Sequence, residues 1–340
     1  MTRRPAVPSA ATYSSRLAMR CIPLCVFLLV LVTAPARAEW YSEAREKMGT
    51  KVEIQLWAGS EAAARPLLAA GMAEFDRIES WMSTYREDSE ISRVNRLAAR
   101  EPVKASAELF GVVAKSLELS ALSDGAFDIT FDSVGKLYDF RSGVRPDADA
   151  IQQRLPDINY RHVLLDPAAL TIRFTKEGTR INLGGIGKGY SCERVIELLR
   201  KAGVTNALVN AGGDTRLLGD RRGKPWVVGI RDPDDGQHWV TRLALEDEAI
   251  STSGDYERYF DEDGVRYHHI LDPKSGKSAS GLRSVTVIGP DATMTDGLST
   301  SVFVLGPERG LALIETTPGY AAVIIDAEHQ VRFSKALRSR

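Results

Sequence analysis

Cysteine is scarce in this chain of 340 residues, and so is any excess of charge of one sign. Two of the three cysteines lie within the first 25 residues, so Cys192 is alone in the rest of the chain. An intramolecular disulfide is therefore excluded there. The 44 basic and 45 acidic residues nearly balance, so the composition lacks the basic excess of a nucleic-acid-binding protein. Internal repeats and low-complexity linkers are also absent from the sequence.

The N-terminus combines basic residues, an apolar run and a small-x-small triplet. The arginines are Arg3, Arg4, Arg16 and Arg20, the apolar run covers 21–32, and the triplet is Ala36-Arg37-Ala38. This order predicts a secretory signal peptide over residues 1–38, because the run is too short to span a membrane. A retained N-terminal anchor is the other interpretation. Cleavage removes five arginines and no acids, leaving 39 basic and 45 acidic residues, which again argues against a nucleic-acid partner.

Two kinds of periodicity predict the fold class. Residues 48–57, MGTKVEIQLW, alternate apolar and polar side chains like a half-buried strand, and a long helix follows from Ser60. A second helix is expected over about 106–123. From Arg161 onward short strands and tight turns predict antiparallel sheet, interrupted by one helix after a glycine cluster and another near Thr295. We expect an α+β fold, with antiparallel sheets flanked by helices, in one domain of one or two lobes over 39–340.

The glycine cluster is INLGGIGKGYSCERVIELLRKAG, residues 181–203, which runs directly into an amphipathic helix. Free N–H groups at the start of that helix, near Gly187 to Gly189, would attract an anion. Lys188 adds positive charge where the helix dipole disfavours it, so an external phosphate is the better explanation. Neither known phosphate loop matches, since Asn182 and Gly189 break the P-loop pattern and Tyr190 breaks the dinucleotide fingerprint. A crowded turn where the helix packs on a strand is the alternative.

Two further clusters contain oxygen ligands. Gly212-Gly213-Asp214 follows an apolar strand, and a plain hairpin turn explains it as well as a ligand-binding loop does. Only one helix separates it from the first glycine cluster, so we expect the two turns to share one rim of the site. In ATMTDGLSTSVFVLG, residues 292–306, Asp296 and Thr300 project from one face of a predicted helix. Such ligands, completed by backbone carbonyls, suit Mg²⁺. A helix cap with a buried hydroxyl is the alternative.

Adjacent histidines end a strand in YHHILDPKSGKSASG, residues 267–281. His268 and His269 point to opposite faces of that strand. One of them is a candidate general base, although a histidine is more often structural. The segment STSGDYERYF adds hydroxyls and Asp255 at another strand entrance.

Eight segments, in this order, resemble the ApbE family of FAD:protein FMN transferases, whose members attach FMN through a phosphoester to a threonine or serine of another protein. They are the early MGT, WMSTYREDSEISRVN, GAFDIT, LGGIGKGY, NAGGD, TSGDYER, HHILDPKSGK and TDGLST, and they extend from about Met48 to Leu305. The resemblance implies an ApbE-like fold around an FAD cleft, Mg²⁺ dependence, transfer of FMN from FAD to the acceptor hydroxyl, and release of AMP.

The resemblance also implies site residues. FAD contacts are expected from Met48, Tyr85, Ala126, Phe127, Asp128, Lys188 and Leu271, and we add Asn182, Gly213 and Asp214 to this set. Mg²⁺ is expected on Asp296, Thr300 and the backbone carbonyl of Gly185, with His269 activating the acceptor hydroxyl and Lys188 neutralising phosphate charge. Asn182 stands where the family often has an Asp. Because an amide carries no negative charge, we expect Asn182 to contact the flavin or the metal more weakly, or only through hydrogen bonds. Glu193 stands where an Asp is usual near the start of the helix.

Two alternatives fit the same residues. One is a pyrophosphatase that hydrolyses FAD to FMN and AMP, and the other is a non-catalytic flavin-binding or electron-transfer module. The signal peptide predicts a periplasmic protein, soluble or peripherally associated with the inner membrane. The acceptor is then expected to be a membrane redox subunit or an exported flavoprotein. Neither the identity of the acceptor nor the oligomeric state follows from the sequence.

Overall fold

An eight-stranded sheet runs through the computed structural model, which describes residues 38–235 and 238–338. Every neighbouring pair in it is antiparallel. In spatial order the strands are β1 (Glu39–Lys47), β2 (Thr50–Ala58), β6 (Ala207–Ala211), β7 (Asp214–Leu218), β10 (Ala249–Gly254), β15 (Leu282–Gly289), β16 (Ala321–Asp326) and β17 (Val331–Phe333). The α+β fold with antiparallel sheet that the sequence predicts is confirmed.

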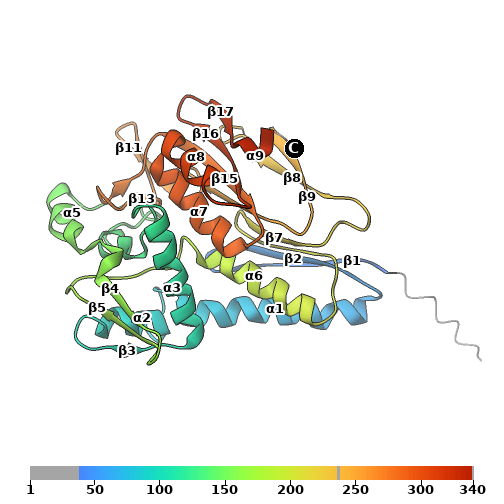
Figure 1. The fold of residues 1–340 in the computed structure, drawn as a ribbon, viewed down its shortest axis with the longest axis horizontal. Coiled ribbons are helices and arrows are strands. Elements are labelled where there is room, and N and C mark those ends of the chain that lie inside the picture. The colour runs from blue at the N-terminus through green and yellow to red at the C-terminus, as the bar shows by residue number, and fades with distance from the viewer. Residues whose placement is uncertain (1–37, 236–237, 339–340) are drawn as a thin grey trace, which may run out of the picture. The chain divides into compact units, whose positions relative to one another are not determined.

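Helices cover one face of this sheet because their apolar stripes need a partner. α1 (Glu61–Met82) packs on β2, α6 (Gly187–Lys201) on β6 and β7, α7 (Ala292–Leu305) on β10 and β15, and α8 (Pro307–Glu315) on β16. Figure 1 shows α1, α6 and α7 along the sheet, and α6 contacts both of the others. The alternating residues of β2, Val52, Ile54 and Leu56, are fully buried in the core beneath α1 and α6.

A hairpin covers the opposite face of the sheet. It consists of β8 (Trp226–Arg231) and β9 (Trp239–Leu245). Successive residues of a strand point to opposite faces. Leu218 accordingly belongs to the core beneath the helices, whereas its neighbour Leu217 packs with Trp226 and Leu245 of the hairpin. Both faces of β7 are therefore covered, and all five of its residues are buried.

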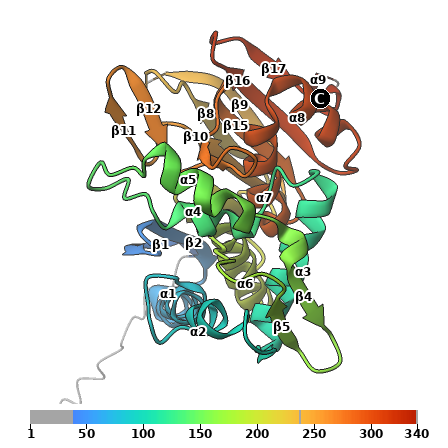
Figure 2. The same ribbon diagram turned by 90° about the vertical axis from the view of Figure 1, so that its left-hand side faces the viewer.

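Shorter elements surround this framework. The helices are α2 (Glu90–Leu97), α3 (Ala107–Leu122), α4 (Asp132–Gly135), α5 (Ala148–Arg154) and α9 (Lys335–Arg338), with 3-10 turns at Ile129–Phe131, Leu155–Asp157 and Tyr160–His162. The small sheets are β3–β5–β4 (Val103–Lys104, Thr171–Phe174, Val163–Asp166), β11–β12 (Tyr259–Glu262, Val265–His268) and β13–β14 (Leu271–Asp272, Lys277–Ser278). In Figure 2 the β11–β12 hairpin stands beside the loop between α4 and α5.

The strand predicted over 48–57 begins two residues later than expected. Met48 and Gly49 have φ angles of 53° and 71° and form a two-residue turn between β1 and β2. Positive φ at both central positions gives a turn whose twist suits a hairpin. β1 itself was not predicted, because EWYSEAREK mixes charged and aromatic residues without a clear apolar alternation.

The helix predicted near Thr295 begins earlier, at Ala292. Its cap is Asp291, whose carboxylate accepts hydrogen bonds from the backbone N–H groups of Thr293 and Met294. The cap interpretation of the segment therefore applies to Asp291, and Asp296 lies in the second turn of α7 instead.

The predicted signal peptide, 1–38, lies outside the described residues except for Ala38. The residues that the structure describes belong to one compact unit. None of the helices in that part of the chain is long and apolar enough to cross a membrane.

The contact between α6 and α7 makes a stability prediction. A Cβ on Gly189 would lie 2.0 Å from the carbonyl oxygen of Ala292, whereas a Cβ on Gly111, within α3, would meet nothing within 4 Å. We expect Gly189→Ala to lower the free energy of unfolding by about 2 kcal/mol or more, and Gly111→Ala to raise it by about 0.5–1 kcal/mol. Urea unfolding measures both, and a Gly189→Ala variant as stable as the wild type would contradict this helix packing.

Candidate active site

The first turn of α6 lies against α7. A Cβ on Gly189 would come 2.7 Å from the Cβ of Asp296, and one on Gly187 would come 2.8 Å from the Cε of Met82. Both glycines therefore allow close packing, as the crowded-turn interpretation predicts. The same packing brings the start of α6 directly beside the Asp296 side chain.

The backbone N–H groups at the start of α6 are engaged within the protein, in contrast to our expectation of free donors. Gly187 donates to the carbonyl oxygen of Leu183 at 2.8 Å, and Gly189 donates to Oδ2 of Asp296 at 2.9 Å. A carboxylate at this position satisfies the donors that would otherwise attract an anion. Any phosphate here would therefore be held by side chains more than by these two N–H groups.

Lys188 lies between two buried carboxylates. Its Nζ is 2.5 Å from Oδ2 of Asp214 and 3.6 Å from Oδ1 of Asp296. Asp214 and Asp296 are only 1% and 2% exposed. The three groups come from three elements, α6, β7 and α7, and the pairing of Lys188 with Asp214 brings the two glycine clusters close together.

The electrostatics of this trio are those of a shared ammonium. Burial lowers the pKa of Lys188, but the charges of Asp214 and Asp296 outweigh it and hold the pKa above its ordinary value. Burial and then the charge of Asp296 raise the pKa of Asp214, against the opposing effect of Lys188. When both carboxylates are ionised, the cluster of two carboxylates and one ammonium has an excess of negative charge, which favours a further cation.

The three residues expected to bind Mg²⁺ lie on one side of the molecule. A Cβ on Gly185 would lie 3.5 Å from Oγ1 of Thr300, and Asp296 is one turn earlier on α7. Oγ of Ser253 lies 3.4 Å from Oγ1 of Thr300 and extends the set of oxygens. Among the described residues no three His, Cys, Asp or Glu side chains cluster as metal ligands, but a carboxylate, a hydroxyl and a carbonyl form an oxygen set that fits a hard cation.

The two histidines have different environments. Nε2 of His268 bonds the carbonyl oxygen of Ala279 at 2.8 Å, and its Nδ1 accepts the N–H of Ile270 at 3.3 Å. Both ring nitrogens of His268 are thus used by the backbone. Nδ1 of His269 is buried and has no hydrogen-bond partner in the described part of the chain. His269 is therefore the ring that retains a nitrogen for another group.

Positive neighbours surround His269. Burial, and then the charges of Arg258 and Lys188, lower its pKa to about 3. The ring is consequently neutral at pH 7 and its free nitrogen can accept a proton. Arg258 was not singled out in the sequence, although it belongs to the segment TSGDYER that carries the resemblance.

The strained turn at Met48 lies beside α6. Its backbone N–H donates to Oε2 of Glu79 at 3.1 Å, and its sulfur lies 3.4 Å from the hydroxyl oxygen of Ser191. A non-glycine residue at positive φ costs on the order of 1 kcal/mol or more, so the contacts around Met48 hold it in place. This places the Met48 turn next to the helix that carries Lys188.

The remaining predicted FAD contacts differ in exposure. Tyr85 is 93% exposed, whereas Ala126, Phe127 and Leu271 are buried. The Phe127 ring lies against Gly185, where a Cβ would be 3.2 Å from it. Asp128 is buried and accepts hydrogen bonds from the N–H groups of Thr130 and Tyr160, so its carboxylate holds the local backbone.

Asn182 organises the glycine turn. Its side-chain oxygen accepts the N–H of Gly184 at 2.8 Å, and its amide nitrogen donates to Oδ1 of Asp132 and to Oγ1 of Thr84. Glu193 similarly acts within the protein, since it accepts the N–H of Ala292 at 3.0 Å. Both departures from the family pattern thus have defined structural roles.

The two remaining candidate segments, around Asp214 and Asp255, form a hairpin turn and an ion pair. Gly212 and Gly213 make the turn of the β6–β7 hairpin and both have positive φ, so the hairpin interpretation is correct and Asp214 follows at its base. Asp255 pairs with Arg283 at 2.7 Å and is not part of the cluster around Lys188.

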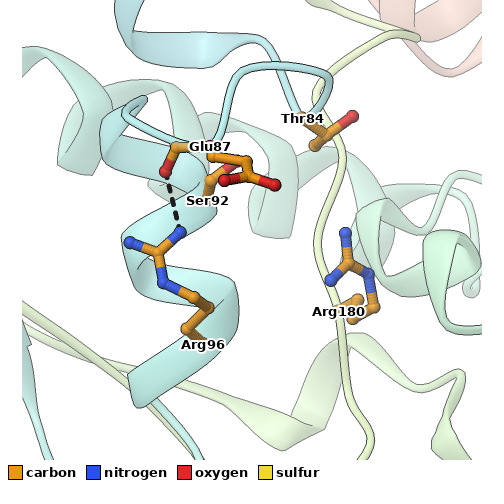
Figure 3. Close-up of a pocket in the computed structure, with 5 residues that line it drawn as sticks. All are labelled: Thr84, Glu87, Ser92, Arg96 and Arg180. Carbon is orange, nitrogen blue, oxygen red and sulfur yellow. Dashed lines mark hydrogen bonds between the residues drawn. The ribbon is translucent and has the colours of Figure 1, made fainter.

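A pocket of about 430 Å³ adjoins Asn182 (Figure 3). It lies between α2 and the extended segment before α6, and its lining residues are Thr84, Glu87, Ser92, Arg96 and Arg180. Sequence reasoning missed these positions, because they are spread over two segments whose proximity depends on tertiary packing. WMSTYREDSEISRVN, which carries three of the five, was the available signal.

His268 makes the protein sensitive to acid. Burial lowers its pKa to about 4, so below pH 6.5 the unfolded chain binds the proton more readily and stability falls as the pH falls. The loss at pH 5 is about 2 kcal/mol. In His268→Gln we expect the difference in unfolding free energy between pH 7 and pH 5 to shrink by about that amount. His238→Gln, which alters an exposed ring, is the control, and an unchanged difference in His268→Gln would contradict the assignment.

Comparisons with known proteins agree with this geometry. The family model described as "ApbE family" matches residues 48–324. A Treponema pallidum protein named FAD:protein FMN transferase is 32% identical over 324 residues, covering 90% of this chain and 90% of its own. A Vibrio cholerae protein of the same name is 37% identical over 248 residues, covering 71% of this chain and 73% of its own.

A solved structure has the same fold. The crystal structure of the ApbE protein from Thermotoga maritima superimposes with a TM-score of 0.82 at 32% identity, and the match covers 88% of this chain and 99% of that one. The family match extends over the whole site, from the Met48 turn to α7. The chain therefore belongs to the ApbE family.

Proposed function

We propose that this protein is an FAD:protein FMN transferase, an enzyme that transfers FMN from FAD to a hydroxyl of an acceptor flavoprotein. The convergence of Lys188, Asp214, Asp296 and Thr300 on one side of the α6–α7 contact is the observation that supports it most. Relatives with that activity in their names match nine-tenths of the chain or nearly so. The remaining details concern the metal, the acceptor residue and the leaving group.

The metal that we propose is Mg²⁺, held by the carboxylate of Asp296, the hydroxyl of Thr300 and the carbonyl of Gly185. The bound ion would supply shielding of the negative charge on the diphosphate of FAD. Asp296 keeps its position through the N–H of Gly189, and the hydroxyl of Ser253 lies 3.4 Å from that of Thr300. Lys188 adds a second positive charge, and Asp214 sets the direction of its ammonium group.

His269 is the group that we propose takes the proton from a threonine or serine hydroxyl of the acceptor. The hydroxyl oxygen then bonds to the FMN phosphorus, the bond from that phosphorus to the bridging oxygen breaks, and AMP leaves with that oxygen. Arg258 and Lys188 depress the pKa of His269 in the free protein. The phosphates of FAD bound beside Lys188 would offset the charge of Lys188, and the basicity of His269 would then rise.

The reaction can be followed by mass spectrometry of a candidate acceptor domain incubated with the enzyme, FAD and Mg²⁺. We expect the acceptor to gain the mass of FMN at a threonine or serine, with one AMP released for each transfer. Asp296→Asn should lower the rate by a factor on the order of 100 or more, because the metal site loses its charged ligand, and chelation of Mg²⁺ should do the same to the wild type.

Glu246→Gln, at an exposed residue of the β9–β10 connection, is the control for that substitution. Full activity of Asp296→Asn without added metal would contradict the metal assignment. Release of AMP and FMN with no mass gain on any acceptor would favour hydrolysis of FAD instead.

We further propose that residues 1–38 are a cleaved signal peptide and that the enzyme acts on an acceptor outside the cytoplasm, in a membrane redox complex or an exported flavoprotein. The basic, apolar and small-x-small order of the segment supports this. The mature protein purified from its host should begin at Glu39. An N-terminus at Met1 in intact-mass measurements would contradict cleavage.

A further inference from the structure

Two arginine side chains meet at the Met48–Gly49 turn. Nη2 of Arg258 donates to the carbonyl oxygen of Gly49 at 3.1 Å. A Cβ on Gly49 would lie 3.3 Å from Nη2 of Arg258 and 3.4 Å from Nη2 of Arg141. Both guanidinium groups therefore approach one point on the backbone, and two like charges are held close together.

No acidic side chain pairs with either arginine within the ranges that the structure describes. Asp139, the acid nearest to Arg141 in the loop, directs its carboxylate to the N–H groups of Arg141 and Ser142 and to the Ser142 hydroxyl. Glu257, beside Arg258 in sequence, is exposed and forms no ion pair with it. The pair of cations is thus left without an anion of the protein's own.

Other arginines of the same surface are ion-paired. Arg145, on the same loop as Arg141, pairs with Glu262, and Arg266 of β12 pairs with Asp261 at 3.2 Å. The lack of partners is therefore particular to Arg141 and Arg258 and is not a general property of this surface. Adjacent unpaired guanidinium groups are a favourable site for a carboxylate or phosphate.

Aromatic contacts link the two segments that carry Arg141 and Arg258. Tyr138 stacks on Phe140 with ring centroids 5.1 Å apart, Phe140 contacts Phe260 at 6.3 Å, and Phe260 stacks on Tyr267 at 5.3 Å. This series ties the loop that carries Arg141 to the β11–β12 hairpin that follows Arg258, as the neighbouring segments in Figure 2 show. The two segments that carry the guanidinium groups are consequently held beside each other before a ligand arrives.

The arginine pair is next to the proposed base. The N–H of His269 donates to the carbonyl oxygen of Arg258 at 3.1 Å. Arg141 and Arg258 are both exposed, in contrast to the buried Asp214 and Asp296. Anything bound by the arginines would thus lie at the rim, on the side from which an acceptor reaches His269.

We propose that Arg141 and Arg258 bind a carboxylate side chain of the acceptor protein and so place its hydroxyl at His269. The inference rests on the proposed function and adds an electrostatic requirement to the acceptor. The exposed position favours a macromolecular carboxylate, because Arg141 and Arg258 lie at the surface whereas Lys188 lies between the buried carboxylates of Asp214 and Asp296. The planar guanidinium groups suit bidentate contact with a carboxylate.

Steady-state kinetics of FMN transfer test this with an acceptor domain that the wild-type enzyme modifies. We expect Arg141→Gln and Arg258→Gln each to raise the KM for the acceptor about tenfold or more, because a charge-assisted hydrogen bond is lost. The KM for FAD should stay within about twofold. Arg145→Gln removes one charge from the same loop and is the matched control, with both KM values unchanged.

A charge scan of the acceptor identifies the partner. Replacing each Asp by Asn and each Glu by Gln near the modified residue should reveal one position whose loss raises the KM for wild-type enzyme by the same factor. The same acceptor substitution should not raise the KM of the Arg141→Gln enzyme any further, since the acceptor carboxylate and Arg141 form one interaction.

Three results would overturn the inference. They are a rise in the KM for FAD in place of that for the acceptor, an equal effect of Arg145→Gln, and additive effects of the acceptor and Arg141→Gln substitutions. Failure of the proposed function would look different, because the wild-type enzyme would then add no FMN mass to any acceptor.

Discussion

The ammonium group of Lys188 is the interaction on which the arrangement of the site depends. Burying two carboxylates in one place is costly unless a cation is shared between them. Lys188 provides that cation, the N–H of Gly189 satisfies one oxygen of Asp296, and the hydroxyl of Ser251 bonds Asp214. These contacts join α6, the β6–β7 hairpin and α7, so that the position of each element depends on the other two.

The residual negative charge of this cluster connects its structure to its chemistry. A protein that only needed to pack α6 against α7 would gain more from apolar side chains at these positions. The carboxylate of Asp296 and the hydroxyl of Thr300 are instead the kinds of oxygen ligand that our proposal of a bound Mg²⁺ requires. The exposed arginines at the rim carry the opposite charge, and the charge of Arg258 acts on both Lys188 and His269.

The sequence predicted the fold class because the alternation of Val52, Ile54 and Leu56 leaves little choice of structure. It could not predict the strand order, since β2 pairs with β6 only after an intervening stretch that contains three long helices and a small sheet. Gly189 shows the same limit at the site. Close approach of a phosphate and close approach of α7 both require glycine there, and only the fold shows that α7 is the neighbour.

β1 and β17 form the two edges of the main sheet. An uncovered edge strand offers unpaired backbone groups on which strands of other molecules can add, which leads to aggregation. β17 is only three residues long, and β1 carries both acidic and basic side chains, among them Glu43, Arg45 and Lys47. Both edges therefore oppose the growth of fibres by strand addition. β17 is too short to pair with a long strand, and pairing on β1 would require its charged side chains to be desolvated.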